Sequence, residues 1–201
     1  LKSAASRGGR PDPDVVGTLD VWDAKLAAAG ETLVAARAGL TAALAPATGD
    51  SYRGLAAASG TETRLEVGLD YQRSWEGPLA EALAAARGED LRRGVTTVGP
   101  HRDDLHLTIG GLPARSHASQ GEQRSLALAL RLAGHRVVTA RLETPPVLLL
   151  DDVFSELDAD RAAALLERLP AGQALLTTAG ALPPGAAPAV VVHVEAGKLV
   201  G

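Results

Sequence analysis

The feature that most constrains this sequence is a run of four aliphatic residues, Val147 to Leu150, that stops at two neighbouring acids, Asp151 and Asp152. A short apolar run bounded by polar segments fits a strand buried in a parallel sheet. In open α/β sheets, ligands bind beyond the carboxyl ends of such strands. The sequence therefore predicts two carboxylates at a ligand-binding edge, although a buried strand that ends in two solvated acids is the simpler alternative.

Acidic residues such as these two take part in the hydrolysis of phosphate bonds. One carboxylate at a strand end can hold a Mg²⁺ ion through water, and its neighbour can orient or deprotonate an attacking water. The segment Ser155-Glu156-Leu157-Asp158 follows, and Leu157-Asp158 opens a further predicted helix. Because the amino end of that helix is expected to face the acid pair, the segment favours a functional site over two solvated acids.

A second feature lies upstream, where Ser119-Gln120-Gly121-Glu122-Gln123-Arg124 begins an apolar helix. A hydroxyl and a glycine at a helix start present free backbone amides at the positive end of the helix dipole, which suits an anion. Ser119 and Glu122 also have the spacing of a capping box, in which each side chain bonds the other residue's amide. Taken alone, these residues favour the cap, and the anion site is the alternative.

Helical and strand-like patterns change in character near residue 95. Before it, apolar residues recur at three- and four-residue steps from Asp20 until Pro46, which predicts a helix of about 25 residues with one apolar stripe. The residues of the stripe are Val21, Trp22, Leu26, Ala29, Leu33, Ala36, Leu40 and Leu44.

The remaining patterns predict an α/β fold. The expected elements are a loop over residues 3–17, strands over 63–71, 95–98, 105–109, 147–150, 175–177 and 190–194, helices over 78–86, 121–139 and 160–169, and turns at 110–111 and 196–197. Strands separated by helices indicate parallel strands that helices cover on both faces. The domain boundary is expected near residue 95.

Composition narrows the class of protein. The net charge of -4 gives no bulk attraction to nucleic acid, and the absence of cysteine excludes disulfides and thiolate metal sites. No apolar run approaches the ~20 residues of a membrane span and no signal-peptide pattern occurs, so a cytoplasmic protein is expected. The chain opens with Leu1 and contains no Met, which indicates a fragment.

Together, the segments around Ser119, Asp151 and Asp158 resemble the signature motif, Walker B and D-loop of the ABC-type ATPases. They resemble the RecF family of DNA replication and repair ATPases more than transporters. That family reads Ser-Gln-Gly-Gln-Gln-Arg at the signature, from which this chain departs only at Glu122, and Leu-Leu-Asp-Asp at the strand end. Its Val-Gly-Pro-His-Arg-Asp-Asp segment is matched by residues 98–104. The resemblance implies part of a helical arm over residues 1–94 and the carboxy-terminal lobe of an ATPase head over 95–201.

The resemblance also implies roles for individual residues. Asp151 would be the Mg²⁺-side carboxylate, through water, and Asp152 would polarise the attacking water. Asp158 would lie in a dimer interface, and Thr177 would occupy the switch position, with an ordinary β-branched strand residue as the equal alternative. The residues implied to contact the γ-phosphate of a nucleotide on the opposite protomer are Ser119, Gly121 and Gln123, and Gln120 between them is also implied to bind the nucleotide.

Two positions of the family segment have no role that the residues alone supply. His101 and Arg102 either contact phosphate or DNA, or belong to a structural proline turn with a buried histidine, which is the favoured interpretation. Glu122 places a negative charge near the implied phosphate unless its side chain turns away to cap the helix.

The family resemblance implies ATP and Mg²⁺ as cofactors of an ATP-dependent homodimer. The implied partners are single-stranded and gapped double-stranded DNA and mediators of the RecO and RecR type, in recombinase loading and SOS-linked repair. No Gly-x-x-x-x-Gly-Lys-Ser/Thr loop occurs in the sequence, so this chain alone is expected neither to bind ATP tightly nor to hydrolyse it. The alternatives are an SMC-like chromosome-organising or other repair ATPase head, an ABC transporter subunit, or a degenerate head that serves only protein contact.

Overall fold

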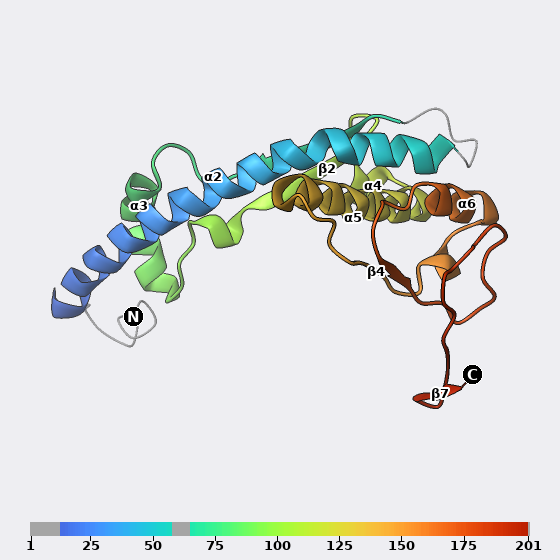
Figure 1. Ribbon diagram of the computed structural model, residues 1–201. Coiled ribbons are helices and arrows are strands. Elements are labelled where there is room, and N and C mark those ends of the chain that lie inside the picture. Colours follow the sequence, from blue (N-terminus) through green and yellow to red (C-terminus); the bar gives the residue numbers. More distant parts are fainter. Residues whose placement is uncertain (1–12, 58–64, 201) are drawn as a thin grey trace. The chain divides into compact units, whose positions relative to one another are not determined.

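The computed structural model describes residues 13–57 and 65–200, which form two compact units (Figure 1). The first unit comprises Leu1–Pro46 and Glu66–His117, and the second comprises Ala47–Leu65 and Ala118–Gly201. Residues 95–117 therefore group with the first unit. The division into an arm over 1–94 and a lobe over 95–201 differs from these units and stays a prediction about function. The predicted loop over residues 3–17 lies mostly outside the described residues.

The longest element is helix α2, Pro13–Ala57, which contributes to both units. The predicted end of this helix at Pro46 is wrong, because the helix continues through Pro46 for three further turns. A proline inside a helix removes one backbone hydrogen bond. The segment beyond it buries one face in the second unit, through Thr48, Ser51, Tyr52 and Leu55, and this burial favours continuation of the helix.

The predicted apolar stripe of α2 is largely on the wrong face. Val21 and Trp22 are 57% and 53% exposed, and Leu33 and Leu40 are exposed as well. The buried positions are instead Leu19, Ala27 and Val34. Gly30 lies on this face, where a Cβ atom would come within 3.3 Å of the Pro100 ring and closer still to Leu79. The buried face of α2 carries small residues such as Ala27 and Gly30 because neighbouring groups pack closely against it. A count of large apolar side chains does not detect such a face.

A hydrophobic cluster joins α2 to α3, Leu79–Arg93, in the first unit. Its buried members are Ala27, Val34, Trp75, Leu79 and Leu83. Helix α3 starts after Pro78, which is the N-cap, and ends at Gly94, whose positive φ of 70° suits glycine. The carboxylate of Glu31 on α2 accepts the amide of Leu79 at 2.8 Å, so one acid satisfies a free amide at the start of α3.

The first unit also contains an antiparallel sheet in the order β1-β2-β3, formed by Val67–Gln72, Asp104–Ile109 and Leu112–Pro113. The predicted turn at Gly110-Gly111 is confirmed, since both residues have positive φ and Ile109 pairs with Leu112. The strand predicted from residue 63 begins at Val67, with residues 63 and 64 outside the described part. The short elements η1, Pro100–Arg102, and α4, Ala114–His117, flank β2 and β3.

The strand predicted over residues 95–98 does not form. The Asp90 carboxylate accepts the amide of Thr97 at 2.8 Å and its hydroxyl at 2.5 Å. Asp90 is fully buried on α3, so these bonds hold the segment against that helix. The β-branched residues of this segment indicated an extended backbone. The hydrogen bonds between Asp90 and Thr97 hold that backbone against α3 instead of in a sheet.

The second unit has the predicted α/β organisation. Helix α5, Gln120–Leu142, precedes strand β4, Leu148–Leu150, and helix α6, Ala159–Glu167, connects β4 to the parallel strand β5, Ala174–Leu176. The short helix η2, Val153–Glu156, follows β4. Strands β6, His193–Glu195, and β7, Lys198–Val200, form a hairpin whose turn is at Ala196-Gly197, as predicted. The α/β class is confirmed.

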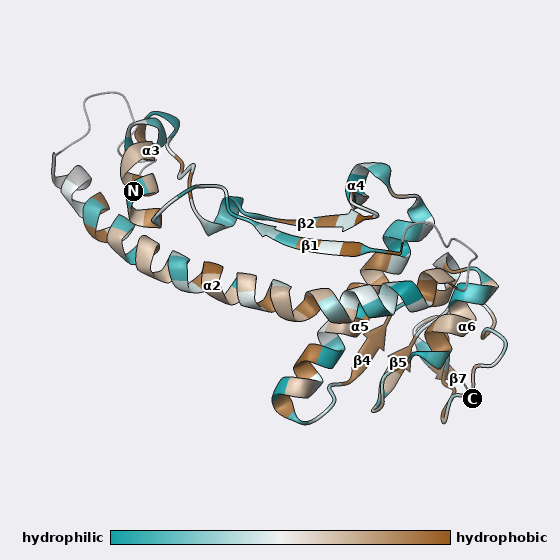
Figure 2. Ribbon diagram, turned by 90° about the horizontal axis from the view of Figure 1, so that it is seen from above, coloured by the Kyte–Doolittle hydropathy of each residue, from teal (hydrophilic) through white to brown (hydrophobic). Residues whose placement is uncertain are grey.

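One face of the β4–β5 pair is covered among the described residues. Leu148 and Leu150 are buried, whereas Leu149 and Leu175, which pair with each other, are 63% and 53% exposed. Figure 2 shows the hydrophobic colouring of β4, and Figure 1 shows α5 and α6 on one side of it. The prediction that helices cover both faces is therefore wrong for this chain by itself.

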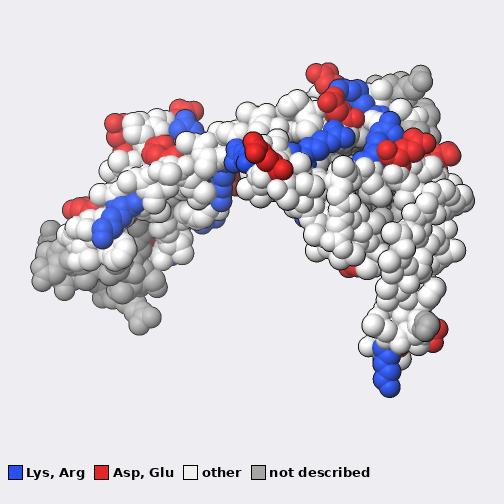
Figure 3. Space-filling model, viewed as in Figure 1, with Lys and Arg blue, Asp and Glu red and all other residues white. Residues whose placement is uncertain are grey.

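The described helices do not include one whose length and hydropathy would suit a membrane span. Acidic and basic side chains are interspersed on the face shown in Figure 3, without an extended area of one sign. This distribution accords with the modest net charge of -4.

Candidate active site

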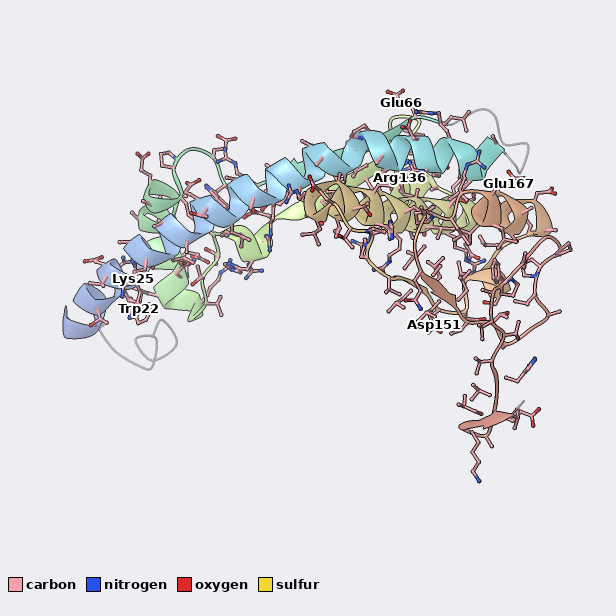
Figure 4. All side chains as sticks on the ribbon, viewed as in Figure 1. Trp22, Lys25, Glu66, Arg136, Asp151 and Glu167 are labelled. Atoms are coloured by element: carbon pink, nitrogen blue, oxygen red, sulfur yellow. The ribbon has the colours of Figure 1, made fainter. Side chains whose placement is uncertain are left out.

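The acid pair lies at the end of β4, as the sequence predicted, and Figure 4 labels its first member, Asp151. Asp151 and Asp152 follow Leu150 directly and are both exposed. Thr177 follows the neighbouring strand β5, and its amide donates to the Leu150 carbonyl at 3.0 Å. The Thr177 hydroxyl donates to Oδ1 of Asp151 and accepts the amide of Asp152 at 2.8 Å. One hydroxyl therefore bonds both acidic residues.

The backbone at Asp152 adopts the left-handed conformation, with φ 45° and ψ 32°. Aspartate tolerates this region better than most residues, at a cost on the order of 1 kcal/mol. The conformation is held from both sides, since Thr177 binds the amide and the Ser155 hydroxyl donates to the Asp152 carbonyl at 2.9 Å. Such a fixed turn is typical of positions where function restricts the backbone.

The oxygen donors at the end of β4 fit a Mg²⁺ ion of the kind found with nucleotides. Thr177 donates to one oxygen of the Asp151 carboxylate. Mg²⁺ commonly keeps several waters and binds one or two carboxylates together with substrate phosphates. Within the described residues no group of three or more His, Cys, Asp or Glu side chains forms a metal site. The donor set therefore fits a Mg²⁺ ion that water and phosphate complete, rather than a site made by protein alone.

The start of α5 forms the predicted capping box. The Ser119 hydroxyl accepts the amide of Glu122 at 3.2 Å, and the Glu122 carboxylate accepts the amide of Ser119 at 2.7 Å. The charge of Glu122 is thus turned toward its own helix end. The first intrahelical bond runs from the Gln123 amide to the Ser119 carbonyl at 3.0 Å. The amides of Gln120 and Gly121 precede it and have no intrahelical acceptor, so the cap leaves room for an anion.

The other polar side chains of this helix start lie at its surface. Ser119 and Gln120 are exposed, and Gly121 is partly buried. The side-chain amide of Gln123 donates to the Ala118 carbonyl at 3.1 Å, which folds it back onto its own chain. An anion that met this helix end would therefore meet backbone amides first.

Asp158 caps α6 and connects it to the start of α5. Its two carboxylate oxygens accept the amide and Nη1 of Arg161, at 2.8 and 2.9 Å. The same guanidinium lies on Gly121, where a Cβ atom would be 2.8 Å from Nη1. The sequence prediction did not include Arg161. Its spacing from Asp158 indicated a local pair at a helix start, but only the fold places it on Gly121.

The structure thus brings the predicted residues together as two groups within the second unit. The first group, at the ends of β4 and β5, contains Asp151, Asp152 and Thr177. The second group, at the starts of α5 and α6, contains Gly121 and Asp158 with Arg161 between them. The roles of these residues toward a nucleotide stay predictions.

The turn at residues 98–104 belongs to the first unit and is built by structural contacts. Asp103 accepts the Ser74 amide at 2.9 Å and also the Tyr71 hydroxyl. Arg37 of α2 donates to the Pro100 carbonyl at 2.7 Å, and Pro100 is buried. Burial raises the pKa of Tyr71, the Asp103 carboxylate raises it further, and the hydrogen bond from Arg37 lowers it. The structural proline turn is confirmed.

The prediction of a buried histidine in this turn is wrong. His101 and Arg102 are exposed, and Nε2 of His101 lies 3.0 Å from the Thr96 carbonyl. The imidazole lies against Gly99, where a Cβ atom would be 3.2 Å from Nδ1. Gly99 has a positive φ of 136°, a conformation that favours glycine.

Comparison with known proteins agrees with these motifs. No protein-family model matches the chain. The chain is 45% identical over 193 residues to the DNA replication and repair protein RecF of Frankia alni, covering 88% of this chain and 49% of the relative. It is 42% identical to RecF of Kineococcus radiotolerans and 37% identical to RecF of Clavibacter michiganensis subsp. michiganensis, covering 57% and 55% of those proteins.

Solved structures give the same result. A structure of the recombination mediator protein RecF-ATPrS in the RecFOR pathway matches 99% of this chain and 53% of that one, with a TM-score of 0.75 and 25% identity. The corresponding RecF-ATP structure matches with a TM-score of 0.79 and 24% identity, which shows the fold. The chain spans about half the length of the curated relatives that it matches. Identity over nearly the whole chain and the shared fold place it in the RecF family.

Proposed function

We propose that this chain is the carboxy-terminal part of a DNA replication and repair ATPase of the RecF type. In this proposal, residues 95–201 belong to the ATPase head and residues 1–94 to a helical arm. The observation that carries it is the acid pair at the end of β4, whose two members are bonded by the Thr177 hydroxyl. The names of the relatives, which are DNA replication and repair proteins, support the same function.

The acid pair would act on the terminal phosphate of ATP. Bound Mg²⁺ and ATP supply the electrophile and neutralise the charge that develops on the phosphate. Asp151 would hold the ion through water, and Thr177 would fix its carboxylate. Asp152 would orient the attacking water and accept its proton as the bond from water oxygen to phosphorus forms and ADP leaves.

The starts of α5 and α6 would complete the site of a partner protomer. The free amides of Gln120 and Gly121, together with Ser119 and Gln123, would face the γ-phosphate of a nucleotide bound there. Asp158 would lie beside it in the interface. Ser119 is exposed and is therefore accessible to a second copy, which supports this assignment.

The wider setting is proposed from the relatives. The two solved neighbours are described as RecF with ATP or ATPrS in the RecFOR pathway. On this basis the complete protein would dimerise with ATP, bind single-stranded and gapped double-stranded DNA, and work with mediators of the RecO and RecR type in the cytoplasm. Recombinase loading in SOS-linked repair is the cellular process that we propose for it.

Substitution of Asp152 tests the proposal. The protein is extended with the residues that the relatives have and this chain lacks, and phosphate release is measured with wild type, D152N and E167Q. Wild type is expected to hydrolyse ATP, and D152N to lose on the order of 100-fold in rate, because the water is no longer deprotonated. Glu167, an exposed acid at the other end of α6, is the control, and E167Q should retain wild-type turnover.

A DNA gel shift with the same proteins separates repair from transport. Gapped duplex is expected to be retained by wild type and D152N when ATP is present. Hydrolysis by D152N at the wild-type rate, or DNA retention that ignores ATP, would contradict the proposal.

A further inference from the structure

Arg161 occupies an unusual electrostatic position. Its backbone belongs to the first turn of α6 and its guanidinium lies on Gly121 in the first turn of α5. The amino end of a helix carries partial positive charge, so a cation at that place is unfavourable. Here one cation lies at two such ends. The ion pair with Asp158 offsets this cost at the start of α6, but it does not explain why the guanidinium reaches Gly121 of α5. Departures from such rules are expected at functional sites.

The side chain is held firmly in this position. Arg161 is 17% exposed and Asp158 is 48% exposed. Asp158 binds both the amide and Nη1 of Arg161, which fixes the start of the side chain and its end. A guanidinium bound in this way is a rigid, planar group with defined directions.

The contact with Gly121 explains a glycine at this place. A Cβ atom there would lie 2.8 Å from Nη1, 3.3 Å from Cζ and 3.3 Å from Nη2 of Arg161. Any side chain at position 121 would displace the guanidinium and disturb its pair with Asp158. Gly121 thus allows one arginine to join the signature segment to the D-loop segment.

We propose that Arg161 is a positioning residue that couples Asp158 to Gly121. The coupling holds the starts of α5 and α6 in one arrangement for the terminal phosphate of a nucleotide on the partner protomer. It also holds a guanidinium, paired with Asp158, beside the first turn of α5. This inference rests on the proposed function and adds a residue that the motif resemblance does not include.

A double-mutant cycle in the 201-residue chain tests the contact itself. Urea unfolding is measured for wild type, G121A, R161A and the double variant. The shift that G121A causes in the unfolding midpoint is expected to fall by roughly half or more in the R161A background, since the displaced group is gone. Shifts that add without interaction would overturn the contact.

The functional role is tested in the extended protein by ATP-dependent dimerisation, measured by sedimentation. R161A and R161Q are expected to raise the ATP concentration for half-maximal dimerisation roughly tenfold, through loss of a charged, hydrogen-bonded contact. R161K keeps the charge without the planar fork, so it should restore part of the response.

The C-cap of the same helix, Arg168, offers a matched control, because its guanidinium likewise lies on a glycine, Gly54. R168A removes a similar contact away from both motifs and should keep the wild-type dependence on ATP. If R161A and R161Q behave as R168A does while wild type responds to ATP, the role of Arg161 is wrong and the proposed function stands. A wild-type protein that does not respond to ATP would contradict both.

Discussion

At the scale of single residues, the acid pair is organised by a neighbour that the sequence left ambiguous. Thr177 was compatible with both a switch residue and an ordinary strand residue. In the structure its hydroxyl bonds Asp151 and the amide of Asp152 across the ends of two parallel strands. The sequence predicted where the acids lie, because four aliphatic residues determine the strand. It could not predict the hydrogen bonds, which depend on the register of β4 with β5.

Replacement of Thr177 by valine tests this hydrogen bonding. T177V keeps the shape of the side chain and loses the hydroxyl. The variant is expected to lower the free energy of unfolding by about 1 kcal/mol, which is the usual net contribution of a hydrogen bond. T177S retains the hydroxyl and should remain nearer to wild type. Urea unfolding followed by circular dichroism gives both values. Equal stability of T177V and T177S would show that the hydroxyl contributes nothing.

At the scale of elements, helices and strands with strong local signals were predicted well. The capping residues marked the start of α5, and the apolar run marked β4. The prediction failed for α2, because a helix rich in alanine is weakly apolar on every side. Its buried face was chosen by the close approach of α3 and the turn at Pro100 to Gly30. Packing of small residues is a tertiary property, and periodicity alone does not reveal it.

Two glycines of α2 test this account. A Cβ atom at Gly30 would collide with Leu79, so G30A is expected to destabilise the chain by about 1–3 kcal/mol. Gly39 has no atom within 4 Å of a Cβ atom, so G39A should stabilise it by about 0.5–1 kcal/mol through helix propensity. Chemical denaturation of both variants checks the opposite signs. Stabilisation by G30A would show that the buried face is assigned wrongly.

At the scale of the whole molecule, the chain contains residues that we propose as parts of an ATPase site, and its sequence contains no phosphate-binding loop, which such sites need. The acid pair and the starts of α5 and α6 are present, whereas no glycine-rich loop ending in Lys-Ser or Lys-Thr occurs in the sequence. The relatives are about twice as long as the matched region. Local motifs therefore predicted where the proposed site residues lie in the fold, and the proposed activity also needs a phosphate-binding loop that this sequence does not contain.

The 201-residue chain by itself is expected to release no phosphate from ATP above background. The loop whose backbone amides and lysine bind the phosphates is missing from the sequence, so affinity and catalysis are lost together. Phosphate release and equilibrium dialysis with labelled ATP measure the two properties, with the extended protein as the positive control. Turnover by the purified chain would overturn this expectation.

The exposed face of α2 has a practical consequence for spectroscopy. The sequence contains two tryptophans, and both belong to the first unit: Trp22 is 53% exposed beneath the Lys25 ammonium, and Trp75 is 8% exposed. Acrylamide should quench Trp22 and spare Trp75. A W22F protein would then emit from a single shielded indole, so its fluorescence would report melting of the first unit without interference from the second.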